Sequence, residues 1–143
     1  MNILRIVITF IVMFGAISPP QAKMMLFGGV GHDDYLGCLD CSEYSPDSLC
    51  NEYGSHGSEY SSGGLFNEYG SYGSQYSSKS PWNEYTSSKD VPVLVDDSGN
   101  FYGYFTINRY RSDAVGFAAD LGNLYDSADG DLKLVRDGIC AIF

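Results

Sequence analysis

Basic residues are scarce in this chain of 143 residues, which carries eight Lys and Arg against eighteen Asp and Glu, a formal net charge of −10. Such a surplus of negative charge repels phosphate backbones, so we expect no nucleic-acid partner. Histidines are fewer still, with only His32 and His56. No Gly-x-Ser-x-Gly, His-Glu-x-x-His or phosphate-loop pattern occurs. These absences favour a non-catalytic protein without a cofactor. One enzyme alternative is a secreted hydrolase, because carboxylates distant in sequence can meet in a fold.

Long hydrophobic runs are also lacking, apart from one near the start of the chain. It extends from Ile6 to Ile17, follows Arg5 and precedes Ser18–Ala22. This layout is typical of a secretory signal and is short for a membrane span. We therefore predict a signal peptide over residues 1–22, export to the periplasm or cell exterior, and no stable membrane insertion after its removal. An uncleaved N-terminal anchor is the competing interpretation.

Cysteine is present in a small, even number: Cys38, Cys41, Cys50 and Cys140. Two disulfides are expected of an exported chain of this size. We favour pairing Cys41 with Cys50 and Cys38 with Cys140, which closes one short and one long loop. Because Cys38 and Cys41 also form a Cys-x-x-Cys motif, a thiol-disulfide oxidoreductase is an alternative function. The segment lacks the strand and helix that such enzymes place around the motif.

Metal-binding patterns fail when their spacing is examined. The acidic segment 126–131 cannot be an EF-hand, because aligning Gly130 with the loop glycine puts Arg136 where a bidentate Glu is needed. A zinc site would require a second Cys-x-x-Cys or paired histidines. We interpret 126–131 as a helix stop with Asp131 near the next helix N-terminus, and we predict no metal.

A 16-residue pattern dominates residues 44–90, with copies that begin at Tyr44, Tyr60 and Tyr76. A fixed period indicates units that bury their apolar faces by stacking on their neighbours. We expect each copy to be a turn, a short helical step and a second turn. The apolar positions expected to point inward are Leu49, Leu65, Cys50, Phe66 and Trp82. The tyrosines would form two ladders: Tyr44, Tyr60 and Tyr76 in one, and Tyr53, Tyr69 and Tyr85 in the other.

The abundance of tyrosine in this segment has two interpretations. The rings could be the core of a domain poor in aliphatic residues, with each hydroxyl bonded to the backbone. They could instead form a recognition surface, because Tyr among Ser and Gly gives adaptable contacts at low entropic cost. The second interpretation predicts a partner at the cell exterior, either a protein or a glycan. Cross-β self-assembly is a third possibility that frequent Gly and Ser oppose. The candidate binding surface is Tyr53, Tyr60, Tyr69, Tyr76, Trp82 and Tyr85.

Residues 91–143 have the patterns of ordinary secondary structure. Runs at 91–95 and 101–107 flank a turn-rich link and predict a β-hairpin, with Pro92 indicating an edge strand. The residues expected to point inward are Val91, Val93, Val95, Phe101, Phe105 and Ile107. Apolar spacing predicts a helix behind a Ser112 cap and a second helix over about 130–141, which Cys140 would join to the rest of the protein. With the segment 23–43 and the repeats, this makes one α+β domain stapled by disulfides, in which the repeats pack on the hairpin and two C-terminal helices.

Several of these motifs together resemble a known group of proteins. They are Asp47-Ser-Leu-Cys-Asn-Glu-Tyr-Gly54, the block from Tyr69 to Asn83, and Asp97-Ser-Gly-Asn-Phe-Tyr-Gly-Tyr-Phe-Thr106. Over residues 35–107 the chain is similar to small exported bacterial proteins of uncharacterised function with Tyr-Gly-x-Tyr-Gly-Ser-x-Tyr-Ser repeats. The resemblance implies export from a bacterial cell and supplies no activity, substrate or catalytic residue.

Overall fold

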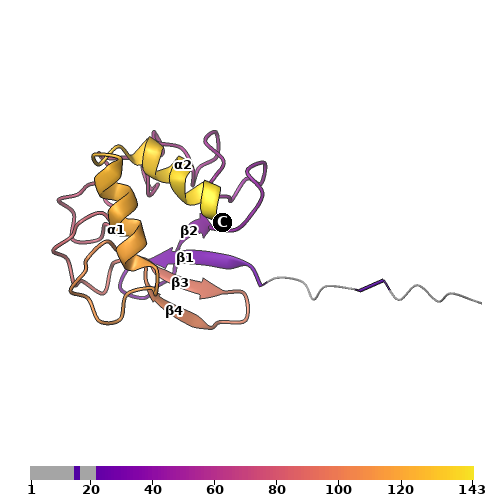
Figure 1. Ribbon diagram of the computed structural model, residues 1–143, viewed down its shortest axis with the longest axis horizontal. Helices are drawn as coiled ribbons and strands as arrows, with labels where there is room; N and C mark the ends of the chain where they lie inside the picture. The colour runs from indigo at the N-terminus through magenta and orange to yellow at the C-terminus, as the bar shows by residue number, and fades with distance from the viewer. Residues whose placement is uncertain (1–14, 17–21) are drawn as a thin grey trace, which may run out of the picture.

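The computed structural model describes residues 15–16 and 22–143. The predicted signal segment therefore lies largely outside the described residues. The architecture is α+β, with a four-stranded antiparallel sheet beneath two helices, and a long turn-rich segment between the second and third strands (Figure 1). The elements are β1 (Met24–Gly28), β2 (Asp34–Cys38), β3 (Val93–Asp96), β4 (Phe101–Tyr104), α1 (Ala118–Ser127) and α2 (Leu132–Ile142).

The sheet has the order β2-β1-β3-β4, and all neighbouring strands are antiparallel. The predicted hairpin is present as β3 and β4. Pro92, however, does not mark an edge strand, because β3 pairs with both β1 and β4. The proline lies just before β3, where its carbonyl accepts a hydrogen bond from the Phe105 amide at 2.7 Å. An imide nitrogen at this position removes no hydrogen bond from the ladder.

One residue of the hairpin faces solvent against expectation. Phe101 is 57% exposed, whereas Val91, Val93, Phe105 and Ile107 are buried as predicted. The cause is an irregularity in the pairing of β3 with β4 after Leu94, which places Phe101 opposite Val95 and Tyr104 opposite Val93. A bulge of this kind changes which side chains share a face.

The core is built between the sheet and the helices. A large cluster joins Leu26, Leu36 and Leu94 of the sheet to Leu121 of α1 and Val135 of α2. A smaller cluster on the opposite face contains Val91, Val93 and Tyr104. The turn-rich segment also contributes to the large cluster, through Leu49, Leu65, Phe66 and Trp82. Four of the five inward positions predicted for residues 44–90 are thus buried, and the fifth, Cys50, is half-buried.

Hydrogen bonds near their N-termini explain where the two helices begin. Helix α2 starts after Asp131, whose carboxylate accepts from the amides of Lys133 and Leu134, as an N-cap residue does. Helix α1 starts later than predicted, and Ser112 is not its cap. Tyr104 holds this stretch in a strand-like ladder instead: its amide donates to Asp113 O and its carbonyl accepts from the Val115 amide, both at 2.9 Å.

Both disulfides join partners other than those we favoured. Cys38 is bonded to Cys41, and Cys50 is bonded to Cys140, 90 residues away. The predicted pairing is therefore wrong, although Cys140 does fasten the last helix to the body of the protein. Backbone hydrogen bonds explain the difference: Cys38 pairs with the 47–49 segment through Asp47 O and the Leu49 amide. This pairing carries the next residue, Cys50, away from Cys41 and towards α2.

Candidate functional site: a row of exposed tyrosines

Seven tyrosines stand out from the turn-rich segment and the loop after β4. Their exposed fractions lie between 83% and 94%, although tyrosine is usually half-buried. We call this set the tyrosine row: Tyr44, Tyr53, Tyr60, Tyr69, Tyr76, Tyr85 and Tyr110. The row includes five of the six residues predicted as a binding surface. The sixth, Trp82, is 1% exposed and cannot contact a partner.

Each tyrosine of the row occupies the same position in a tight turn. Two residues before it stands an Asn or a Ser, whose side-chain oxygen accepts a hydrogen bond from the tyrosine amide; at Asn51, Asn67 and Asn83 this distance is 3.1 Å. The carbonyl of the same Asn accepts from the residue after the tyrosine, as in the 3.0 Å bond from the Gly54 amide to Asn51 O. These Asx turns need no helix, so the predicted helical step is absent from this segment.

A second hydrogen bond from the same asparagines ties consecutive turns together. The side-chain amides of Asn51, Asn67 and Asn83 donate to the carbonyls of Ser45, Ser61 and Ser77, at 3.2, 3.1 and 3.1 Å. The donor and acceptor positions recur at intervals of 16 residues. Each asparagine side chain therefore accepts from the tyrosine amide two residues later and donates to the serine carbonyl six residues earlier. These bonds keep the backbone that carries the exposed tyrosines ordered.

Trp82 anchors the turns to the core from beneath. Its indole Nε1 donates to Leu65 O at 2.6 Å, and its ring stacks on Tyr125 of α1 with centroids 5.8 Å apart. Phe66 and Phe105 pack against the same indole. A buried aromatic cluster inside and exposed rings outside thus divide the aromatic residues of this segment into two sets with different roles.

Open clefts follow the row, where its turns lie along the helix pair. The first lies between Tyr44 and Tyr53 and is bounded by Arg136 of α2, and another lies between Tyr60 and Tyr69 beside Leu132. Three more lie between successive tyrosines from Tyr69 to Tyr110 and are bounded by Leu132, Tyr125 or Asp126. Figure 1 shows the corresponding loops on the outer side of α1 and α2. We call these five the row clefts.

Acidic residues accompany the rings. Glu precedes the tyrosine at five of the seven turns, Gln75 precedes Tyr76, and Arg109 precedes Tyr110. Hydrogen bonding to the adjacent carboxylate, and its negative charge, raise the pKa of Tyr53, Tyr60, Tyr69 and Tyr85 above the usual value. At all five Glu-Tyr turns, the carboxylate and the ring that follows it line the same cleft.

Neither these Glu-Tyr pairs nor the seventh turn, at Tyr110, was predicted from the sequence. The available signal was the dipeptide Glu-Tyr, which recurs at alternating separations of nine and seven residues from Tyr44 to Tyr85, with Gln75 once in place of Glu. Asn108-Arg109-Tyr110 repeats the Asn-x-Tyr pattern outside the 16-residue period, and the Tyr110 amide donates to Asn108 Oδ1 at 3.0 Å. A search for Asn or Ser two residues before Tyr would have found all seven positions, together with Tyr102 and Tyr125, which are not in the row.

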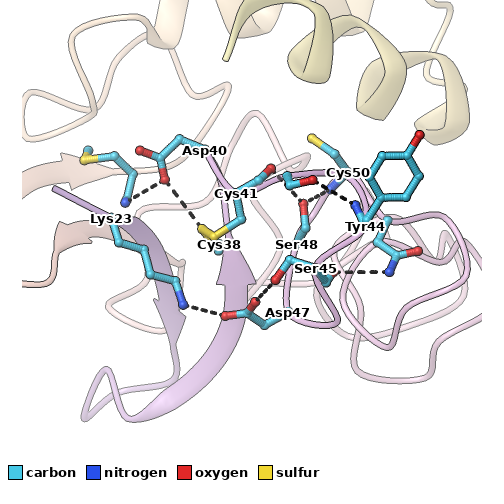
Figure 2. The surroundings of a disulfide bond; sticks show 12 residues. Lys23, Cys38, Asp40, Cys41, Tyr44, Ser45, Asp47, Ser48 and Cys50 are labelled. Atoms are coloured by element: carbon cyan, nitrogen blue, oxygen red, sulfur yellow. Dashed lines mark hydrogen bonds and ion pairs between the residues drawn. A yellow bond between two sulfur atoms is a disulfide. The ribbon is translucent and has the colours of Figure 1, made fainter. Parts of the chain in front are cut away.

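The Cys38–Cys41 disulfide lies at the end of β2, beside an ion pair. Figure 2 shows Asp47 accepting from Lys23 Nζ and Ser45 Oγ, both at 2.6 Å. These contacts, with a third from Tyr35, lower the pKa of the Asp47 carboxyl strongly. Asp40 lies next to the disulfide, where it accepts from the Met24 amide at 2.9 Å. These contacts hold the start of β1, at Lys23 and Met24, against the residues around the disulfide, which is a structural role.

Within the described part of the chain, Cys38, Asp40 and Cys41 are the one group of three ligand-type side chains close enough to share a metal ion. Both sulfur atoms of the group are in the disulfide, and metal binding requires thiolates. The group therefore does not fit a metal. His32, which precedes Asp33 and Asp34, is held by a 2.9 Å hydrogen bond between its Nε2 and Lys89 O.

The chain matches no protein-family model, no curated protein and no solved structure. Among residues 15–16 and 22–143, no helix combines the length and the apolar character needed to cross a bilayer. The two disulfides fit an oxidising, exported environment. Any functional conclusion therefore depends on the geometry of the tyrosine row and its clefts.

Proposed function

We propose that this is an exported, non-catalytic binding protein that uses the tyrosine row to contact a protein or glycan of the periplasm or cell exterior. The observation that carries the proposal is the presentation of seven nearly fully exposed rings on turns of one kind. Exposed tyrosines supply large contact areas and lose few side-chain rotamers on binding. A protein that used these rings for its own core would bury them, as this chain buries Tyr72 and Tyr104.

We also propose that residues 44–90 are three stacked copies of one structural unit. The recurrence of the Asn and Ser hydrogen bonds at 16-residue intervals supports this interpretation. Stacked units present equivalent side chains at regular intervals on one face, which suits an extended partner better than a small ligand. The open row clefts, the smallest about 260 Å³ and the largest about 750 Å³, suit single side chains or single sugar rings.

A binding assay with defined surfaces tests the proposal. The protein without residues 1–22 would be passed over immobilised poly-L-arginine, heparin, chitin and peptidoglycan. We expect binding to at least one of them, and a loss of affinity of about tenfold or more when Tyr53, Tyr69 and Tyr85 are replaced by Ser. Phe101→Ser is the matched control, because it removes an exposed ring outside the row. Equal binding by the triple variant and the wild type, or no binding to any surface, would contradict the proposed function.

A second candidate function, thiol-disulfide exchange, is favoured by one observation, the bond between Cys38 and Cys41. Its setting argues against it. Reactive pairs place an accessible first cysteine at a helix N-terminus, whereas Cys38 is fully buried and ends a strand. An insulin-reduction assay separates the two functions: turnover by the wild type that is lost in Cys38→Ser/Cys41→Ser would support the redox alternative over the binding role.

A further inference from the structure

We infer that the tyrosine row binds an extended polypeptide segment that carries Arg and Lys side chains. This inference rests on the proposed function and names the chemical class of its partner. Three features of the row clefts carry it: their charge, the pairing of rings with carboxylates, and their arrangement in series.

The row clefts are strongly negative. Nine different carboxylates line the five clefts, against three cationic side chains, Arg109, Lys133 and Arg136. All three cations are already paired: Arg109 with Asp126 at 2.9 Å, Lys133 with Asp137 at 3.0 Å, and Arg136 with Asp137 at 3.3 Å. A cleft lined by one sign of charge concentrates ligands of the opposite sign. The complementary partner is therefore cationic.

Each acidic turn presents two groups that attract a cation together. The face of a tyrosine ring attracts a guanidinium or an ammonium group, and a carboxylate beside it adds charge-assisted hydrogen bonds. This protein already uses the combination internally. The guanidinium carbon of Arg111 lies 3.5 Å from the centroid of Tyr104, while its Nε donates to Asp113 at 2.8 Å. We expect the partner's arginines to be held in the same way at the exposed turns.

The arrangement of the clefts favours a chain over a single cation. From Tyr60 to Tyr110 each cleft shares a tyrosine with the next one along the row. A flexible cationic segment can fill several such sites at once, and each further contact is then intramolecular. A neutral glycan could stack on the rings but would leave most of the carboxylates without a counter-charge. A polypeptide with regularly placed Arg and Lys can stack cations on the rings and also neutralise the carboxylates.

One turn of the row shows that Gln can replace Glu before the tyrosine without changing the fold of the turn. At Tyr76 the turn has Gln75 where five other turns have Glu, and its geometry is retained, with a 3.2 Å bond from the Tyr76 amide to Ser74 Oγ. Glu59→Gln, Glu68→Gln and Glu84→Gln should therefore leave the turns folded. A charge-matched control is Asp33→Asn, Asp97→Asn and Asp120→Asn, which removes three exposed carboxylates that do not line the row clefts.

The test measures the affinity of the protein without residues 1–22 for poly-L-arginine, poly-L-lysine and poly-L-glutamate, at low and at physiological salt. We expect tight binding to the two polycations, with arginine ahead of lysine because its planar group stacks on rings, and none to polyglutamate. The Glu→Gln triple variant should lose about tenfold in affinity, and the Asp→Asn control no more than about twofold.

Tyrosine variants distinguish binding by the tyrosine row from non-specific attraction of a polycation to the negative charge of the protein. Tyr53→Ser/Tyr69→Ser/Tyr85→Ser keeps every charge and should still lose about tenfold, while Phe101→Ser, which removes an exposed ring outside the row, should lose less than about twofold. Equal losses in the Glu→Gln variant and the Asp→Asn control would overturn the inference. Tyrosine-dependent binding to chitin or peptidoglycan without binding to polycations would also overturn it, but would leave the proposed function standing. Absence of binding to every probe would remove both.

Discussion

The ring of Trp82 lies flat against that of Tyr125, with an angle of 6° between their planes. Tyr125 belongs to α1, whereas Trp82 belongs to the turn-rich segment and also donates a hydrogen bond to Leu65 O. This pair therefore joins the segment that carries the tyrosine row to the helices that bound its clefts. The arrangement of the row depends on the pair even though neither ring is among the row's exposed tyrosines.

Replacing Trp82 should destabilise the whole domain. Trp82→Ala removes a large buried ring, and we expect the free energy of unfolding to fall by about 3–5 kcal/mol. Trp82→Phe keeps most of the packing but leaves Leu65 O without its donor, a loss of about 1–3 kcal/mol. Urea unfolding followed by circular dichroism measures both, since the chain has a single tryptophan for fluorescence. An alanine variant as stable as the wild type would contradict this description of the core.

The two disulfides should differ in their contribution to stability. In the chain-entropy model, the 90-residue separation of Cys50 and Cys140 corresponds to about 4–5 kcal/mol, and the three-residue separation of Cys38 and Cys41 to about 2 kcal/mol. We therefore expect Cys50→Ala/Cys140→Ala to lower the unfolding free energy more than Cys38→Ala/Cys41→Ala. Peptide mapping of the unreduced protein checks the pairing itself. Peptides linking Cys41 to Cys50 would contradict the structure.

Gly73 illustrates why some glycines of residues 44–90 cannot be replaced. A Cβ at this position would lie 1.8 Å from Asn67 O, whereas a Cβ at Gly63 would meet nothing within 4 Å. Because the clash is with backbone, we expect Gly73→Ala to cost about 1–3 kcal/mol or to prevent folding. Gly63→Ala is the control and should change stability by no more than about 1 kcal/mol. Thermal unfolding of the two variants compares them directly, and equal midpoints would argue against the close approach.

Acid should weaken the β3–β4 turn through Asp96. Hydrogen bonds from the Asn100 side chain and amide lower the pKa of Asp96 from 3.8 to about 2. Because the folded pKa is below the unfolded one, the stabilisation is present above about pH 4 and is lost as the pH falls towards 2. Asp96→Asn should lower stability at neutral pH and flatten its decline between pH 4 and 2.

Urea unfolding at a series of pH values measures the effect of Asp96. Asp97→Asn removes the same charge from the exposed neighbouring position and serves as the control. The unfolding free energy of Asp97→Asn should fall between pH 4 and 2 as much as that of the wild type. If Asp96→Asn and the wild type lost stability in parallel between pH 4 and 2, the hydrogen bonds of Asp96 would not be the cause.

Elements with a strong local signal could be predicted from the sequence. The hairpin and α2 follow from apolar spacing and from the Asp131 cap, and the burial of Leu49 and Leu65 follows from the repeat. Strands β1 and β2 were missed. Each has five residues, and β1 finds one of its partners in β3, far along the chain. The pairing of β1 with β3 over such a distance has no local signal. Strand β2 pairs only with β1, directly before it in the chain, so this hairpin could have been predicted from its short link.

The site was predicted in part, for a related reason. Repetition identified the tyrosines and placed Trp82 at an inward position, but Trp82 was also included in the binding surface, which is wrong because it is buried. The difference between exposed and buried rings depends on which side of a turn each residue occupies, and that is fixed by the side-chain hydrogen bonds of Asn67 and Asn83. The disulfide pairing likewise depends on the contact of Cys38 with Ser48, which is a tertiary feature.

Chemical modification of tyrosine should reproduce the division between exposed and buried rings. Tetranitromethane reacts with accessible phenolates, so we expect native protein to be nitrated at the seven tyrosines of the row and spared at Tyr72 and Tyr104, which are buried. Tyr72 is protected further, because burial and the hydrogen bond from its hydroxyl to Asp34 at 2.8 Å raise its pKa. Peptide mapping after a short reaction measures each site, and urea-unfolded protein, in which every tyrosine should react, is the control. Nitration of Tyr72 as fast as Tyr69 in the native protein would mean that the row is not a distinct surface, and both proposals would lose their structural basis.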